Sequence, residues 1–250
     1  MAEFRPCVVI PIYNHEDTIA DVVESLNYLK IPVLIVDDAS NPATKNTLDE
    51  LAQNNSSVEI LTRSENGGKG AAVTTGLLAA YQKGFSHSLQ LDADGQHFTE
   101  DATKFLEAAK NQPDALVLGK PVFDKSAPKS RIYGRKITHI FVWIETVSFE
   151  IKDTLCGFRV YPLQAFHNIS TQVSLRERMD FDPEIAVRMY WEDVPVINIE
   201  TPVRYFAGGL SNFHFTRDNS LMISLHVSLL LGALRRSLRL IRNAVKRNFS

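Results

Sequence analysis

The sequence predicts an α/β fold built on a mainly parallel sheet that is flanked by helices. Short apolar runs alternate with longer segments of helical periodicity throughout the first half of the chain. Strands and helices that alternate at this spacing form right-handed βαβ units. Polar clusters follow several of the apolar runs, and the carboxyl ends of parallel strands are where such folds bind ligands. A chain of 250 residues with 44% hydrophobic residues can bury a large core around this sheet.

The elements follow in order from these runs. Helical spacing of apolar residues is clearest at Ile19, Val22, Val23 and Leu26, and an Ala-rich helix opens after Gly67-Gly68. Strands are expected at Cys7–Ile12, Val33–Val36, Val58–Leu61, His87–Leu91 and Ala115–Leu118. The helices between and after them are expected at Thr18–Leu29, Pro42–Gln53, Lys69–Lys83 and Asp101–Asn111.

A basic segment runs from Lys120 to Lys136, with Asp124 as its only acid. Its Ser, Pro and Gly content predicts a mobile loop that leads into a helix at Ile137–Val147. A solvated surface loop is the ordinary explanation of such a run, whereas a position beside a phosphate site favours ligand binding.

The C-terminal segment predicts a basic amphipathic helix. Leu221–Leu234 is almost continuously apolar, but 14 residues are too short to cross a bilayer that requires about 20. No acid follows Asp218, and we expect a catalytic domain at 1–218 and a membrane-interfacial tail at 219–250 that contacts an anionic surface. The alternative is a helix that packs on the domain or on a second subunit, as in a homodimer. The basic residues of the tail are Arg235, Arg236, Arg239, Arg242, Lys246 and Arg247.

The cysteine content and the first residues argue against a disulfide-rich, zinc-binding or secreted protein. The only two cysteines, Cys7 and Cys156, lie in apolar runs and cannot form a disulfide framework or a zinc site. The first residues lack the apolar stretch of a signal peptide, so a peripheral protein on the cytosolic face of a membrane is expected, with no nucleic-acid partner.

The segment from Ser88 to His97 carries the clearest chemical signal. A strand ends there in Asp92 and Asp94, and Gln96 follows two residues later. On an extended backbone these three side chains would point to one side. Oxygen ligands of this kind suit Mg²⁺ or Mn²⁺, which bind one or two carboxylates together with substrate phosphates. A polar turn at the end of a strand is the alternative.

Two common nucleotide-binding motifs are excluded. The first strand is followed by Tyr13-Asn14 and not by the Gly-x-Gly-x-x-Gly of dinucleotide-binding folds. Lys69 in the Gly67-Gly68-Lys69-Gly70 segment precedes Gly, whereas a P-loop requires Ser or Thr at that position.

Five blocks in order resemble those of the family-2 glycosyltransferases. The blocks are VIPIYN at 9–14, IVDDAS at 35–40, NGGKGAA at 66–72, DADGQH at 92–97 and CGFRVY at 156–161. The last is similar to the Ser-Gly-Phe-Arg block of dolichyl-phosphate mannosyltransferase and its bacterial polyprenyl-phosphate relatives. The resemblance covers about residues 7–210. It implies a GT-A fold with a mixed, mainly parallel sheet, a GDP- or UDP-sugar donor, and transfer with inversion at the anomeric carbon.

The resemblance also assigns residues. The donor would contact Pro11, Tyr13, Asp37, Asp38, Lys69 and Asp92. The metal would bind Asp92, Asp94 and Gln96. The phosphate of donor or acceptor would meet Arg131, Arg135, Arg159, Arg204 and His214. The alternatives are a structural ion pair beneath the site for Arg159 and an ordinary surface position for His214. Two departures stand out, because His15 precedes Glu16 where the family has an acid, and Cys156 replaces the usual Ser.

The chemistry leaves the acceptor open. A lipid phosphate is already an oxyanion and needs no strong base, whereas a hydroxyl acceptor requires a carboxylate to remove its proton. Asp153, Asp182 and Glu184 are the candidate bases, and Asp94, Asp153 and Arg131 are the expected catalytic residues. The acceptor is therefore a polyprenyl phosphate or a glycan hydroxyl. A sugar nucleotidyltransferase and a non-catalytic sugar-nucleotide-binding scaffold are the competing functions.

Overall fold

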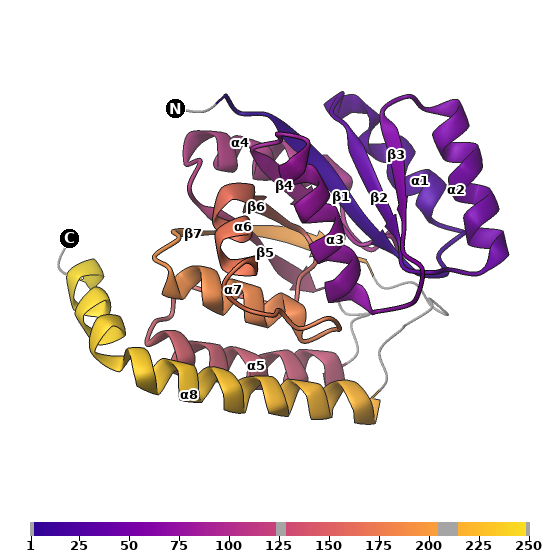
Figure 1. Ribbon diagram of the computed structural model, residues 1–250. Coiled ribbons are helices and arrows are strands. Elements are labelled where there is room, and N and C mark those ends of the chain that lie inside the picture. The colour runs from indigo at the N-terminus through magenta and orange to yellow at the C-terminus, as the bar shows by residue number, and fades with distance from the viewer. Residues whose placement is uncertain (1–2, 124–128, 205–214, 249–250) are drawn as a thin grey trace.

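A seven-stranded sheet forms the centre of the molecule (Figure 1). The computed structural model describes residues 3–123, 129–204 and 215–248, without the side chains of 129–131, 215 and 243–248. The strand order is β3-β2-β1-β4-β6-β5-β7, and only β6 runs antiparallel to its neighbours β4 and β5. The strands are β1 (Pro6–Ile12), β2 (Val33–Asp37), β3 (Val58–Thr62), β4 (His87–Gln90), β5 (Leu116–Phe123), β6 (Arg159–Pro162) and β7 (Val196–Val203).

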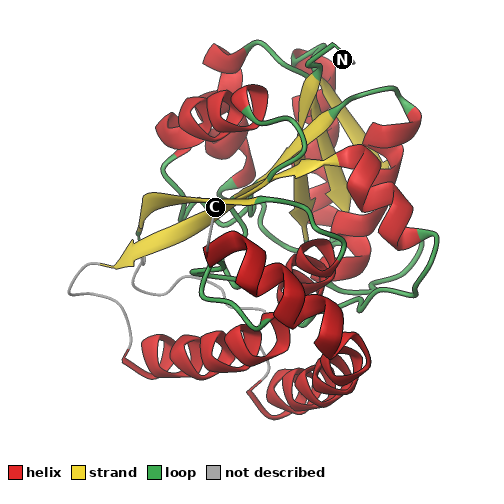
Figure 2. Ribbon diagram, turned by 90° about the vertical axis from the view of Figure 1, so that its left-hand side faces the viewer, coloured by secondary structure: helices red, strands yellow, loops and turns green. Residues whose placement is uncertain are grey.

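Helices cover both faces of this sheet (Figures 1 and 2). Residues of α1 (Ile19–Leu26), α2 (Pro42–Asn54) and α4 (Ala102–Asn111) pack on one face. Residues of α3 (Lys69–Gln82), α6 (Leu163–Ser170) and α7 (Phe181–Trp191) pack on the other. Beyond α7 lie α5 (Lys129–Thr146) and α8 (Phe215–Asn248), side by side along the base of the molecule in both views. Short 3₁₀ turns at Asn27–Leu29 and Thr99–Asp101 follow α1 and precede α4.

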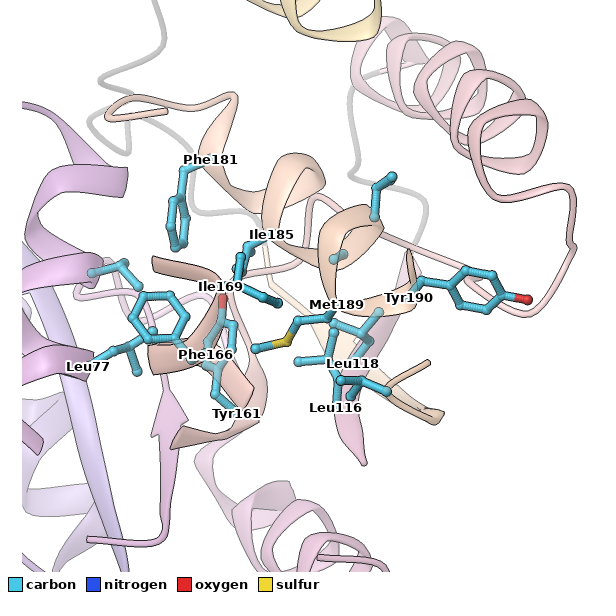
Figure 3. Close-up of a cluster of buried hydrophobic side chains, with 14 of the residues drawn as sticks. Leu77, Leu116, Leu118, Tyr161, Phe166, Ile169, Phe181, Ile185, Met189 and Tyr190 are labelled. Atoms are coloured by element: carbon cyan, nitrogen blue, oxygen red, sulfur yellow. The ribbon is translucent and has the colours of Figure 1, made fainter. Parts of the chain in front are cut away.

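The core beneath α7 is assembled from side chains that are distant in sequence (Figure 3). Phe181, Ile185 and Met189 of α7 are fully buried there with Tyr161 and Phe166. Burial of such side chains contributes about 1.5–3 kcal/mol each, so α7 is held firmly at the end where it meets the site.

The predicted alternation of strands and helices is confirmed in the first half of the chain. Each of the five expected strands and four expected helices is present, with ends that differ by a few residues, and the first helix ends at Leu26 before a 3₁₀ turn. The mixed sheet implied by the family resemblance is also confirmed. Strands β6 and β7 had no separate prediction, because the buried charge of Arg159 and the partly polar β7 conceal the apolar pattern of a strand.

The basic segment is more ordered than predicted. Lys120 to Phe123 continue β5 in register with Glu200 to Val203 of β7, and Lys120 Nζ lies 2.8 Å from Glu200 Oε1. Helix α5 begins at Lys129, eight residues before the expected start. The prediction of a loop over 120–136 was therefore wrong at both ends, because pairing with β7 and contact with α8 override local composition. Its middle, 124–128, lies outside the described residues.

The tail forms one long helix. Helix α8 packs along α5 and α7, with Leu225, Leu229 and Ala233 buried. The apolar run Leu221–Leu234 is short, but the helical segment Thr216–Arg242 that contains it is long and apolar enough, by length and composition, to cross a membrane.

Phe105 provides a test of the core around α4. Its ring is fully buried and stacks on Phe158 at 4.1 Å, so the Phe105→Ala variant should lower the free energy of unfolding by about 3–5 kcal/mol. Phe149 is 70% exposed and makes an edge contact with Trp143, so Phe149→Ala should lower the free energy of unfolding by less than about 1.5 kcal/mol. Urea unfolding of both variants measures the difference, and equal losses would contradict the assigned packing.

Candidate active site

The ends of β1, β2 and β4 place the predicted polar clusters at one edge of the sheet. The three strands are parallel, and β1 is paired with both others. Tyr13 and Asn14 follow β1, Asp37 ends β2, and Asp92 lies two residues after β4. Pro11 lies buried within β1 just before this edge. The clusters therefore converge as the parallel topology predicts.

Asp38 anchors the turn that precedes α3. Its two carboxylate oxygens accept hydrogen bonds from the backbone N–H groups of Gly67 (3.0 Å) and Gly68 (2.7 Å), and Arg63 Nε lies 2.8 Å away. Gly68 has φ +101°, and a Cβ there would press on Glu177 O and the Arg178 side chain. This arrangement fixes the N-terminus of α3 next to the end of β2.

Asp37 is buried beside this anchor. One of its carboxylate oxygens accepts a hydrogen bond from Ser40 N at 2.9 Å, while the other, Oδ2, has no partner within the described structure. An unpaired buried oxygen is costly, so Asp37 Oδ2 suits a hydroxyl donor from a ligand.

The turn after β4 changes direction at Gly95. Asp94 Oδ1 accepts the N–H of Gln96 at 3.0 Å, and Gly95 has φ +69°. The extended backbone that would align Gln96 with the two carboxylates is thus interrupted. Asp92 and Asp94 supply hard oxygen donors, and no cation among the described side chains pairs with Asp94.

Lys69 joins Asp92 to a carboxylate from a distant part of the chain. Its ammonium lies 2.8 Å from Asp92 Oδ1 and 2.9 Å from Asp182 Oδ2 at the start of α7. Burial works to lower the pKa of Lys69, but the charges of Asp182 and Asp92 outweigh it and raise this pKa. Burial likewise works against ionised Asp92, yet Lys69 and His97 hold its pKa well below the usual range. Both groups are therefore charged near neutral pH.

Arg159 braces the other side of Asp182. The side chain is fully buried, and its guanidinium donates to the carbonyl oxygens of Cys156, Thr154 and Asp182. Arg159 Nη1 also lies 3.5 Å from Asp182 Oδ1. These bonds occupy the guanidinium inside the protein, which favours a structural role over the predicted contact with phosphate.

Asp153 holds α5 against the site. Its Oδ1 accepts the N–H groups of Leu155 and Cys156 at 2.8 Å, and Arg135 Nη1 lies 2.6 Å from both of its oxygens. His139 Nε2 lies 3.1 Å from Oδ2. Burial works to raise the pKa of Asp153, but the charge of Arg135 and the His139 hydrogen bond lower it overall.

The loop that contains Asp153 leads directly to the turn after β4 that carries Asp92 and Asp94, called the carboxylate turn below. A Cβ on Gly157 would collide with the Asp92 carboxylate, so only glycine permits this approach. Burial raises the pKa of the neighbouring Cys156 thiol to about 12, which keeps it neutral. Arg204 lies beside the same turn, where its N–H donates to Gln96 O at 3.0 Å and its guanidinium stacks on Phe98 at 3.8 Å.

Two predicted residues cannot be placed. His214 and the side chain of Arg131 lie outside the described residues, although Arg131 itself falls within α5. Sequence reasoning did not single out Arg63 or His139. His139 stands four residues after Arg135 on one helix, a spacing that brings side chains together, whereas nothing local to Arg63 indicates its contact with Asp38.

Asp92 and Asp94 fit a divalent cation whose coordination would be completed by the substrate. The described side chains contain no group of three or more His, Cys, Asp or Glu that could hold a metal by itself. Asp94 offers an open carboxylate, and Asp92 stands two residues before it with Oδ1 on Lys69. Mg²⁺ and Mn²⁺ commonly take one or two carboxylates and draw further ligands from substrate phosphates.

Asp153→Asn tests the buried ion pair. A carboxyl whose folded pKa is depressed stabilises the protein above its unfolded pKa of about 3.9, and the contribution is lost as pH falls through the folded value. The free energy of unfolding of Asp153→Asn should be about 3–5 kcal/mol below that of the wild type at pH 7, and this difference should shrink below about pH 4. Urea unfolding between pH 7 and pH 3 measures the difference, and Asp49→Asn, at an exposed position of α2, serves as the control. A difference that stays constant with pH would contradict the role of ionised Asp153 in this ion pair.

Known proteins resemble this chain in sequence. The model of the family described as "Glycosyl transferase family 2" matches residues 7–178. A dolichyl-phosphate beta-glucosyltransferase of Trichomonas vaginalis is 29% identical over 72% of this chain and 59% of its own length. The UDP-N-acetylglucosamine–dolichyl-phosphate N-acetylglucosaminyltransferase of Methanococcus voltae is 28% identical over 69% and 75%.

The fold has solved counterparts as well. Glucosyl-3-phosphoglycerate synthase from Mycobacterium tuberculosis, in complex with Mn²⁺ and uridine-diphosphate-glucose, superposes with a TM-score of 0.68 at 14% identity. The superposition covers 93% of this chain and 79% of that one, and shows a shared fold. Because the family model spans more than half of the chain, the protein belongs to glycosyl transferase family 2.

Proposed function

We propose that this protein transfers a sugar from a nucleotide-sugar donor to a polyprenyl phosphate, with inversion at the anomeric carbon. A bond forms between an acceptor phosphate oxygen and the anomeric carbon as the bond from that carbon to the nucleoside diphosphate breaks. The diphosphate leaves with the electron pair. The curated relatives carry dolichyl-phosphate in their names, and one also carries a UDP-sugar.

The state of the carboxylates carries this proposal. All three candidate bases are already paired in the described structure. Asp153 is bound by Arg135 and His139, and Asp182 lies between Lys69 and Arg159. Glu184 accepts a hydrogen bond from the backbone N–H of Arg176 and forms an ion pair with Arg188. A hydroxyl acceptor would need one of these groups to remove a proton, whereas a phosphate oxyanion needs none.

The edge of the sheet supplies the donor site. Asp37 Oδ2 is suited to a ribose hydroxyl, with Tyr13 and Pro11 beside the base and Asp38 holding the glycine turn. Asp94, with Asp92 beside it, would hold Mg²⁺ or Mn²⁺, which neutralises charge on the departing diphosphate. Arg204 adds positive charge beside the same turn, whereas Lys69 and Arg135 are paired with carboxylates, and Arg131 belongs to the same helix as Arg135. Such fixed charge favours the transition state, in which the leaving group becomes more negative.

We also propose peripheral attachment to the cytosolic face of a membrane. Helix α8 contains a long apolar segment followed by a run of basic residues, and both cysteines are free thiols buried in the fold. These features support an interfacial helix in a reducing compartment.

A donor and acceptor panel tests the reaction. Purified protein with Mn²⁺, a GDP- or UDP-sugar and a polyprenyl phosphate should release nucleoside diphosphate and form a glycosylated lipid. The matching polyprenol, which carries a hydroxyl in place of the phosphate, should give at least a hundredfold less product. Product from the alcohol alone would overturn the proposed acceptor, and pyrophosphate release would indicate nucleotidyl transfer.

Asp94→Ala tests the cation. Removal of its carboxylate should abolish the Mn²⁺-dependent part of UDP or GDP binding in calorimetry, because the diphosphate loses its bridge to the protein. Asp49→Ala on α2, distant from the site, serves as the control and should bind as the wild type does. Unchanged Mn²⁺-dependent binding by Asp94→Ala would remove the metal assignment.

A further inference from the structure

Helix α5 exposes a continuous apolar stripe. Tyr133, Ile137, Ile140 and Ile144 follow one another at steps of three or four residues, which places them on one face. Each of these side chains is between 52% and 63% exposed. A soluble surface carries single apolar residues, but a stripe along several helical turns indicates a binding surface.

Helix α8 exposes a second stripe alongside it. Its members again recur at steps of three or four residues and are between 52% and 86% exposed. The two helices contact each other and lie together at the base of the molecule, beyond α7 (Figures 1 and 2). The stripe consists of Ile223, Val227, Leu231, Leu234, Leu238 and Ile241.

The charges of these helices identify what can cover the stripes. The only acids in α5 and α8 are Glu145 and Asp218, and both are fully buried. The two helices carry eleven Lys and Arg residues, four in α5 and seven in α8, of which Arg135, Arg217 and Arg239 are paired with acids. Arg235 and Arg242 are exposed beside the α8 stripe, and Lys136 is exposed beside Tyr133. Apolar stripes with cationic flanks and no exposed acid match an anionic bilayer surface.

We infer that α5 and α8 together form one docking surface for an anionic lipid bilayer, so that α5 as well as the tail lies in the membrane interface. This inference rests on the proposed function for its consequence, namely delivery of a lipid acceptor to the site. A second copy of the chain is a poorer occupant, because two such faces would bring like charges together. The surface is therefore a property of two elements that are distant in sequence.

The contacts of α5 connect this surface to the site. Glu145 Oε1 lies 2.8 Å from His226 Nδ1, and both side chains are buried between the two helices. Toward the other end of α5, Arg135 binds Asp153, whose loop carries Gly157 to the Asp92 carboxylate. Docking through α5 thus sets the height and orientation of the carboxylate turn above the lipid phosphates.

Vesicle binding of paired variants tests the surface. The variants are Ile140→Ser/Ile144→Ser on α5, Leu231→Ser/Leu234→Ser on α8, and Tyr28→Ser/Val122→Ser as a control of similarly exposed residues on other elements. Full-length proteins are sedimented with vesicles of phosphatidylcholine containing 30% phosphatidylglycerol. The α5 and α8 variants should each bind about tenfold more weakly or worse, and the control as the wild type does. Circular dichroism and thermal unfolding establish that all variants are folded.

Wild-type binding by the α5 variant, with loss in the α8 variant, would overturn the inference and leave the tail as the sole membrane contact. Equal binding to pure phosphatidylcholine would overturn the charge argument. A concentration-dependent dimer, measured by light scattering and lost in the α5 variant, would show that a second copy covers the face.

Activity separates this inference from the proposed reaction. The α5 variant should retain wild-type turnover on a short, water-soluble polyprenyl phosphate and lose at least tenfold on a long-chain acceptor embedded in vesicles. Equal loss on both acceptors would overturn the docking role of α5. If the wild type turns over neither acceptor, the proposed function fails while the vesicle measurement still decides the docking surface.

Discussion

The ammonium group of Lys69 organises the site, because it pairs with the buried carboxylate of Asp182 and the partly buried carboxylate of Asp92, which come from distant parts of the chain. Asp92 follows β4 and Asp182 opens α7, and each lies within 2.9 Å of the Lys69 Nζ atom. Without this cation, both carboxylates would bear a large desolvation cost. The position of Lys69 depends in turn on the glycine turn that Asp38 holds, so the ends of β2, α3 and β4 form one electrostatic unit with α7.

A second buried carboxylate plays the same part for α5. Asp153 collects Arg135, His139 and two backbone N–H groups, and the segment after it passes directly over Asp92. The acids that could have served as bases are thus used to hold the structure together. The proposed phosphate acceptor, which arrives as an oxyanion, would need no further base.

Much of the fold could be predicted from local pattern. The apolar runs of β1, β2 and β4 are buried along almost their whole length and predict strands directly, and their parallel order implies that Asp37, Asp92 and Asp94 share an edge. Prediction failed where partners come from elsewhere. Residues 120–123 form a strand because β7 pairs with them.

The sequence by itself determined the alternation of strands and helices, the family resemblance and the carboxylate pair after β4, since each rests on residues close together in the chain. Only the tertiary structure decided which charges neutralise one another. Arg159 turns inward to Asp182 and backbone carbonyls, Arg63 reaches Asp38, and α5 packs beside α8. The physical reason is that ion pairs and apolar faces are completed by partners whose positions are set by packing, and no local pattern encodes those positions.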